Sequence, residues 1–285
     1  MKLGLSTYTL TWSVGVPGYD PPLRPLTAEA LVGLTRESGL GLLQIADNLP
    51  LHAMTDEALL RLKQTAGAHR VELEVGTRGT DPELLLRYLG IAGLLGSSLV
   101  RTLVTTPDLA AAEAQIRRVL PDFEAAGVTL AIENHGLHTT EQLVQLFQNL
   151  RSACVGCCLD TVNSFGALEA PDRVIRALSP YLVNLHVKDF EIKRADHMMG
   201  FSILGTAAGA GRLDIPGLKA IAGASGKPGV HAILELWTPY AGSVEETIAV
   251  ERRWMEESLA YLRRVHFTEE EDSQHATGNV KREGL

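Results

Sequence analysis

The sequence predicts an α/β fold of the (β/α)8 TIM-barrel class, formed as a single domain by residues 1–264. Eight short runs rich in Val, Ile and Leu recur along the 285 residues, and their starts lie 27 to 48 residues apart. Each interval has room for a crossover helix, so the strands are expected to run parallel. Eight such units take about 250 residues, which fits this chain. The alternative, a doubly wound open sheet, would show a glycine-rich phosphate turn after its first strand, and residues 6–12 lack one.

In chain order, the strands are expected at residues 2–6, 41–46, 71–76, 98–103, 128–133, 155–160, 182–187 and 230–235. The segments between them carry apolar residues at helical spacing. One helix is expected behind the capping box Thr139-x-x-Gln142, with an apolar face of Leu143, Leu146, Phe147 and Leu150. The last helix repeats this pattern behind Ser243-x-x-Glu246, with Ile248, Met255, Leu259 and Leu262 along one face.

Two intervals between strands are long. The first contains the Gly- and Pro-rich segment 14–22, which is expected to be an ordered active-site loop. The second, residues 188–213, carries the basic residues Lys188, Lys193, Arg194 and Arg212 and the glycines Gly205, Gly209 and Gly211. The glycines could bind a phosphate through backbone N–H groups, although they lack the spacing of a phosphate-binding loop. Both intervals are expected on the face where TIM barrels carry out chemistry.

The composition excludes several classes of protein. With 45% hydrophobic and 21% charged residues, the chain is typical of soluble globular proteins. No apolar run approaches the roughly 20 residues of a membrane span. The apolar block within the first seven residues is too short for the core of a signal peptide, so we expect a cytoplasmic protein. The net charge of −8 argues against a nucleic-acid partner.

The cysteines and the C-terminus add little chemistry. Cys154, Cys157 and Cys158 lie too close together for a disulfide framework and have no second pair to complete a zinc site, so they are expected to be reduced residues of the core. Residues 265–285 lose helical periodicity and are acidic, so we expect a poorly structured tail.

Ionisable residues at the ends of four consecutive strands carry the functional prediction. They are Glu133, Asp160, His186 and Glu235. The carboxyl ends of the strands of a barrel meet at one mouth, so these side chains can surround a single point. Burying three carboxylates and an imidazole without a cation would be costly, and a divalent metal removes that cost. The oxygen-rich set suits Mn²⁺ or Mg²⁺, with Co²⁺ or Zn²⁺ able to compete.

With these four residues, the motifs His186-x-Lys188-Asp189 and Gly209-x-Gly211-x-x-Asp214 make the chain resemble the xylose isomerase-like TIM barrels. That family includes sugar isomerases and epimerases, inosose dehydratases and endonuclease IV, and the resemblance covers about residues 1–264. It implies that the four strand-end residues hold one metal ion. Many members have a second His where this chain has Asn163, and endonuclease IV needs further histidines. A DNA-repair function is therefore disfavoured.

Further residues are expected around the same mouth as substrate contacts. They are Glu74, Arg101, His135, Asn163, Lys188, Arg194 and Trp237. Arg101 is either the partner of an acid such as Glu74 or the anchor of an anionic substrate. The aromatic rings of Trp12, Phe190 and Trp237 could pack against a sugar, although loop packing explains them nearly as well.

The resemblance implies a divalent-metal-dependent isomerase or epimerase that acts on a keto sugar or sugar acid through an enediolate, with Glu133 and Glu235 moving the protons. The alternative is a lyase on the same scaffold, either a decarboxylase of a 3-oxo sugar acid or an inosose-type dehydratase. The observation that supports a lyase is the basic segment after the seventh strand, whose Lys and Arg side chains could bind a substrate carboxylate. Residues 192–201 and 45–50 are also similar to the branch that contains 3-oxo-isoapionate decarboxylases. A sugar-binding protein without catalysis is a third class. In each case the expected partner is a small molecule, and the chain is expected to form a homo-oligomer.

Overall fold

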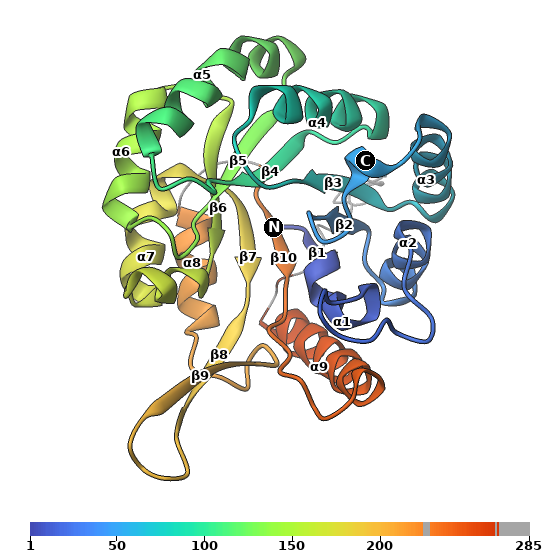
Figure 1. The fold of residues 1–285 in the computed structure, drawn as a ribbon, viewed down its shortest axis with the longest axis vertical. Coiled ribbons are helices and arrows are strands. Elements are labelled where there is room, and N and C mark those ends of the chain that lie inside the picture. Colours follow the sequence, from blue (N-terminus) through green and yellow to red (C-terminus); the bar gives the residue numbers. More distant parts are fainter. Residues whose placement is uncertain (225–228, 266, 268–285) are drawn as a thin grey trace, which may run out of the picture.

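The computed structural model describes residues 1–224, 229–265 and 267. Eight parallel strands close into a barrel in the order β1-β10-β7-β6-β5-β4-β3-β2, and helices surround it (Figure 1). The predicted TIM barrel is confirmed, and every predicted strand is present to within one residue at either end. The barrel strands are β1 (Leu3–Ser6), β2 (Leu42–Ile45), β3 (Glu72–Gly76), β4 (Leu99–Leu103), β5 (Thr129–Glu133), β6 (Val155–Asp160), β7 (Leu182–Val187) and β10 (His231–Leu234).

The helices lie between the strands and cover the outside of the barrel. They are α1 (Thr11–Val14), α2 (Ala28–Glu37), α3 (Asp56–His69), α4 (Pro82–Leu95), α5 (Leu109–Ala126), α6 (Thr140–Leu150), α7 (Pro171–Leu178), α8 (Ile215–Ala224) and α9 (Val244–Arg264). Short 3₁₀ turns complete the connections, namely η1 (Thr7–Leu10), η2 (Leu51–Ala53), η3 (Asn163–Ala167) and η4 (Ser179–Tyr181). The capping box at Thr139 starts α6 as predicted, and Ser243 caps the first turn of α9.

Successive side chains of each strand point to opposite faces, so one set faces the surrounding helices and the other faces the inside of the barrel. On β2, Leu43 and Ile45 face outward and join the large apolar cluster between strands and helices. Gln44 points inward, where the barrel interior is polar and fully buried. The large apolar cluster thus lies between the strands and the helices, whereas polar side chains such as Gln44 are buried inside the barrel.

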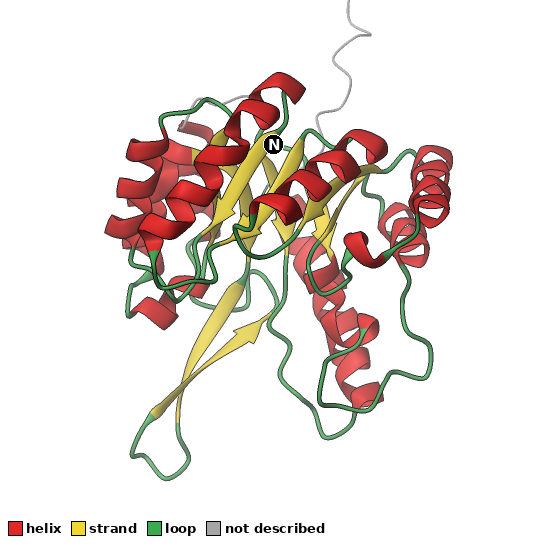
Figure 2. Ribbon diagram, turned by 45° about the horizontal axis from the view of Figure 1, so that its top comes forward, coloured by secondary structure: helices red, strands yellow, loops and turns green. Residues whose placement is uncertain are grey.

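The segment after β7 forms a hairpin of β8 (Asp189–Arg194) and β9 (Phe201–Thr206) instead of the expected loop. It projects away from the barrel (Figure 2). We call it the arm. Several of its apolar side chains are exposed, namely Ile192, Met198, Met199, Phe201 and Ile203. The antiparallel ladder satisfies the backbone groups of a segment that has no core to pack against.

The base of the arm explains the glycine series. Both carboxylate oxygens of Asp189 accept backbone N–H groups, from Gly209 and Gly211 at 2.9 and 3.0 Å and from Phe190 and Leu213 at 2.8 and 3.0 Å. A Cβ on Gly211 would lie 2.2 Å from Asp189 Oδ1, so only glycine fits there. The glycines thus bind a carboxylate of the chain itself, and not a phosphate.

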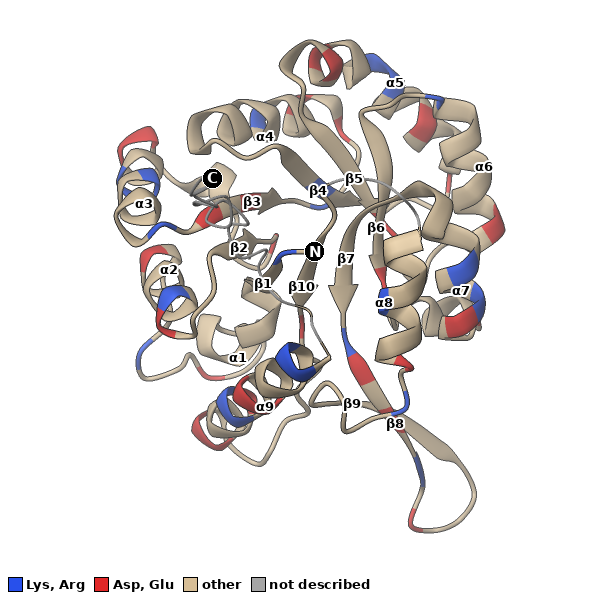
Figure 3. Cartoon of the chain, turned by 180° about the vertical axis from the view of Figure 1, so that it is seen from behind, with Lys and Arg blue, Asp and Glu red and all other residues tan. Residues whose placement is uncertain are grey.

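Charge is distributed without a dominant sign on the outer helices. Figure 3 shows acidic and basic residues mixed along α3, α7 and α9. Within the described residues, no helix is long and apolar enough to cross a membrane. The three cysteines are free, with Cys157 and Cys158 buried.

Of the expected acidic tail, only Val265 and Phe267 are among the described residues. Phe267 has no exposed surface, packs in the large apolar cluster and donates its backbone N–H to Leu262 O at 2.9 Å. Apolar packing therefore extends at least three residues beyond the end of α9.

We expect Phe267→Ala to lower the free energy of unfolding by about 3–5 kcal/mol, because it removes a fully buried ring. Phe201→Ala on the arm is the matched control, since Phe201 is 64% exposed, and should cost below about 1 kcal/mol. Denaturant titration of both variants measures the difference. Equal, small losses would show that Phe267 is not part of the packed core.

Candidate active site

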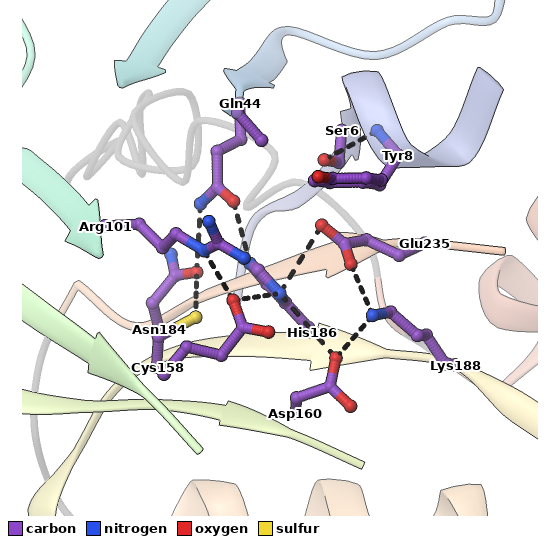
Figure 4. Close-up of polar contacts among 12 residues, drawn as sticks. Ser6, Tyr8, Gln44, Arg101, Cys158, Asp160, Asn184, His186, Lys188 and Glu235 are labelled. Atoms are coloured by element: carbon purple, nitrogen blue, oxygen red, sulfur yellow. Dashed lines mark hydrogen bonds and ion pairs between the residues drawn. The ribbon is translucent and has the colours of Figure 1, made fainter. Parts of the chain in front are cut away.

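The four strand-end residues predicted as metal ligands meet at one point inside the barrel. Glu133 ends β5, Asp160 ends β6, His186 lies in β7 and Glu235 directly follows β10. Asp160 and His186 are direct Cα partners across β6 and β7. All four side chains are buried. Figure 4 shows the carboxylates of Asp160 and Glu235 turned toward the His186 ring.

His186 Nδ1 is surrounded by carboxylate oxygens. It lies 3.4 Å from Glu133 Oε2, 3.4 Å from Glu235 Oε1 and 3.8 Å from Asp160 Oδ2. Among the residues that the structure describes, this buried nitrogen has no hydrogen-bond partner. A buried polar atom without a partner is costly in a protein interior, so its position next to three acids needs an explanation.

The other ring nitrogen indicates which tautomer is present. His186 Nε2 lies 2.7 Å from Gln44 Oε1, an oxygen that can only accept. Nε2 therefore carries the proton, and in the neutral ring Nδ1 presents a lone pair to the three carboxylates. Lone pairs that face one another repel, and a cation between them turns the repulsion into coordination.

The donor set fits a divalent metal. The ligand atoms of Asp160, His186 and Glu235 lie within 4.8 Å of one another, as do those of Glu133, Cys158 and His186. Burial, and next the charge of Glu133, raise the pKa of the Cys158 thiol well above its usual value. Cys158 therefore stays protonated and donates to Asn184 Oδ1 at 3.5 Å. Glu133, Asp160, His186 and Glu235 remain as the residues that would hold the ion.

Lys188 lies against the same acids. Its Nζ is 2.7 Å from Asp160 Oδ2 and 2.8 Å from Glu235 Oε2. Burial would lower the pKa of Lys188, but Asp160, Glu235 and Glu133 raise it above its usual value. Burial likewise favours a neutral Glu235, whereas His186, Lys188 and Arg101 lower the pKa of Glu235 to about 2. The lysine is thus an ammonium and Glu235 a carboxylate.

Arg101 and Asn163 hold Glu133 from two sides. The guanidinium of Arg101 is ion-paired with Glu133 and also donates to Asp47 Oδ1 at 2.7 Å. Asn163 Nδ2 donates to Glu133 Oε1 at 2.7 Å. Of the two roles expected for Arg101, the structure shows the ion pair with acids. Its partners are Glu133 and Asp47, however, and not Glu74. The reason is register, because Arg101 faces Gly76 on β3.

A cavity of about 450 Å³ opens above this cluster. Most predicted site residues line it, namely Arg101, Glu133, His135, Asn163, Lys188, Glu235 and Trp237. Asp160 and His186 lie beneath its floor with no exposed surface. The segment 14–22 contributes Val16 to the wall, as expected for an active-site loop.

Two predicted substrate contacts lie elsewhere. Glu74 is one layer deeper in the barrel, bonded to Gln44, Asn184 and His231, and lines a pocket on another part of the molecule. Arg194 is exposed on the arm, where its guanidinium stacks 4.2 Å from the Phe201 ring. Neither side chain lines the 450 Å³ cavity.

The basic residues of the segment after β7 also lie at separate places in the structure. Lys193 is exposed and paired with Glu191 at 2.6 Å, and Arg212 lines a groove between α7 and α8. Of its four basic residues, Lys188 alone lines the cavity. Phe190 lies at the same groove, where it packs edge-on against Phe165.

Sequence analysis missed several residues of the site. They are Tyr8, Gln44, Arg78 and Asn184. The Tyr8 hydroxyl donates to Asp47 Oδ2 at 3.2 Å, and burial together with Asp47 raises the pKa of Tyr8 above its usual value. Amides within apolar strands, such as Gln44 between Leu43 and Ile45, were the available signal.

Aromatic residues form one rim of the cavity. Trp12 lines it, and its ring centroid lies 4.8 Å from that of Tyr19 and 5.5 Å from that of Tyr240. Trp237 also lines the cavity, with Lys188 Nζ 5.7 Å from its ring centroid. Two of the three aromatic residues singled out in the sequence thus face the cavity, and Phe190 does not.

A closed barrel with an acidic cluster at its carboxyl end defines the class of protein. The family model for the xylose isomerase-like TIM barrel matches residues 83–265, and the chain belongs to this family.

Within the family, the chain is 35% identical over 268 residues to the 3-oxo-isoapionate decarboxylase of Pectobacterium atrosepticum. The match covers 92% of this chain and 95% of that protein. The chain is thus similar to this decarboxylase over nearly its whole length.

Solved structures with lower identity show the same fold. The D-psicose 3-epimerase of Clostridium cellulolyticum H10, solved with D-tagatose, is 18% identical with a TM-score of 0.68, covering 93% of this chain and 99% of that one. A xylose isomerase-like TIM barrel protein from Mycobacterium smegmatis, solved in complex with magnesium, is 14% identical with a TM-score of 0.65, covering 92% and 97%. Both structures thus share the fold of this chain over nearly their whole length.

Proposed function

We propose that this chain is a divalent-metal-dependent decarboxylase of a 3-oxo sugar acid. The observation that carries the reaction class is the 35% identity to 3-oxo-isoapionate decarboxylase over 95% of that protein's length. The observation that supports the metal is His186 Nδ1, which faces three carboxylates and has no hydrogen-bond partner in the described part of the chain. The comparison thus favours the lyase that the sequence analysis had placed second.

Loss of CO₂ from a 3-oxo acid leaves an electron pair that must delocalise onto the neighbouring ketone oxygen. A bound Mg²⁺ or Mn²⁺ would supply Lewis-acid stabilisation of that developing negative charge. The chain's own residues would position that ion. Glu133 and Glu235 line the cavity on either side of His186. Glu133 is held by Arg101 and Asn163, and Glu235 is held by Lys188. Fixed charges of this kind need no reorganisation during the reaction.

A proton must then be returned to the carbon that has lost CO₂. Lys188 is the group suited to supply it, because it lines the cavity and keeps its proton between Asp160 and Glu235. Glu235 is ionised beside it and can pass that proton on or orient the ammonium. Solvent replaces the proton on Lys188 at the end of the cycle.

The substrate carboxylate needs a cation that is not already engaged. Arg101 is committed to Glu133 and Asp47, and Lys188 to Asp160 and Glu235. Arg78 also lines the cavity, its side chain is 59% exposed, and its ion pair with Asp47 is long at 3.6 Å. Arg78 therefore takes the role that the sequence analysis gave to the basic segment after β7.

Isomerisation or epimerisation is the second candidate, and one observation favours it. Two carboxylates, Glu133 and Glu235, line one cavity, and such a pair can remove a proton from a carbon and return it. A sugar ketone without a carboxylate would then be the substrate. A sugar-binding protein without catalysis needs no such pair.

A substrate panel in D₂O separates these functions. The protein loaded with Mn²⁺ should release one CO₂ for each 3-oxo sugar acid consumed and leave neutral keto sugars unchanged, as read by a coupled CO₂ assay and by NMR. Deuterium entering neutral keto sugars without CO₂ would instead identify an isomerase or epimerase. Binding of either substrate class without turnover would identify a binding protein.

A further inference from the structure

A line of hydrogen bonds leads from the candidate metal centre deeper into the barrel. His186 Nε2 donates to Gln44 Oε1 at 2.7 Å, and Gln44 Nε2 donates to Glu74 Oε2 at 2.8 Å. Glu74 Oε1 in turn lies 2.7 Å from His231 Nδ1, which must be the donor of this pair. Gln44 and Glu74 are direct Cα partners across β2 and β3. His186, Gln44 and Glu74 are buried, and His231 is partly exposed.

Glu74 sets the direction of this line because its oxygens face three donors, from Gln44, Asn184 and His231. Asn184 donates its Nδ2 to both oxygens of Glu74, at 3.2 and 3.0 Å, so its Oδ1 faces Gln44 Nε2 at 3.2 Å. Gln44 thus meets two acceptors on one side, Glu74 and Asn184. Turning its amide over would place Gln44 Oε1 against both of them and lose two hydrogen bonds.

The fixed amide decides the tautomer of the imidazole. Because Gln44 presents only its oxygen to the ring, His186 keeps its proton on Nε2. In the neutral ring, Nδ1 is then the nitrogen whose lone pair is directed at Glu133, Asp160 and Glu235. A metal-binding histidine needs this arrangement, and the partner of its second nitrogen maintains it.

We propose that Glu74 and Asn184 are positioning residues for a divalent cation, acting through Gln44 on His186. The inference rests on the metal site of the proposed function but not on the reaction carried out there. The contact of Glu74 with His231 belongs to the same arrangement, because His231 supplies one more donor to the Glu74 carboxylate. These buried polar residues would therefore orient a metal-binding side chain without contacting the substrate.

The test uses Glu74→Gln, which keeps the shape of the side chain but offers both donors and acceptors. We expect the affinity for Zn²⁺, measured by competition with a chelating indicator, to fall about 10- to 100-fold. In ¹⁵N-histidine-labelled protein without metal, the neutral His186 ring should be protonated on Nε2 in the parent and a mixture of tautomers in the variant. The matched control is Glu72→Gln on the same strand, whose carboxylate pairs with Lys2 at the surface. It should change neither signal.

Gln44→Met provides an independent arm if Glu74→Gln is poorly folded. It should lower Zn²⁺ affinity by a similar factor, and Glu74→Gln added to it should have little further effect, because Glu74 acts through Gln44. Parent-like affinity and tautomer in Glu74→Gln, or in Gln44→Met, would overturn the proposal. Additive losses in the double variant would show a merely structural role and overturn it as well. A parent protein that binds no metal would instead refute the metal site itself, whereas normal metal binding without CO₂ release refutes only the proposed reaction.

Discussion

Glu133→Gln and Glu235→Gln should each lower kcat/KM by about 10²- to 10³-fold, the loss typical when one fixed electrostatic group of an active site is removed. Both substitutions keep the side-chain shape but remove a charge that lies 3.4 Å from His186 Nδ1. Glu235→Gln also takes an ionised partner away from Lys188. Steady-state CO₂ release from the 3-oxo sugar acid measures the effect.

Glu141→Gln serves as the control for these two variants. Glu141 is exposed on α6 and pairs with Arg173, so its loss should leave kcat/KM within experimental error. Near-parent activity in both site variants would remove Glu133 and Glu235 from the reaction, whichever product is formed.

Asp160→Asn is expected to weaken divalent-metal binding by more than about 100-fold, since removing a direct ligand should exceed the effect of its supporting residues. Asn is chosen because Asp160 Oδ1 also accepts the backbone N–H groups of Val162 and Asn163, and an amide oxygen can still do so. The turn after β6 is thereby preserved. Elemental analysis of protein purified without chelator and titration with Mn²⁺ provide the measurement.

Asp172→Ala is the control for metal content, because this exposed acid lies at the start of α7 in a separate groove. Its metal content should equal that of the parent. An Asp160→Asn protein that retains the full metal content would exclude Asp160 from the site.

The barrel could be predicted because its strands are buried on both faces and read as nearly continuous apolar runs. The segment Leu42–Ile45 is typical, with Gln44 as its one polar residue. The hairpin of the arm could not be predicted in the same way. Its strands have no buried face along most of their length, and pairs such as Lys193 with Ser202 carry no apolar pattern.

The convergence of Glu133, Asp160, His186 and Glu235 followed from topology alone, since parallel strands bring their carboxyl ends together. Depth within the barrel did not. Glu74 lies two residues before the end of β3 and pairs with Gln44, one layer below the cavity. The register between neighbouring strands sets that layer, and a single sequence does not reveal it.

The excess of acid around His186 also connects function with stability. Among the described residues, Glu133, Asp160 and Glu235 are ion-paired with two cations, Arg101 and Lys188, and Arg101 is shared with Asp47, so folding brings more acidic than basic side chains into this buried space. A divalent ion that binds the folded but not the unfolded chain raises the free energy of unfolding, by about 2.7 kcal/mol when its concentration is 100 times its Kd. The melting temperature of this protein should therefore depend on the metal concentration of its surroundings. Chelation would then shorten the lifetime of the folded chain as well as stop its chemistry.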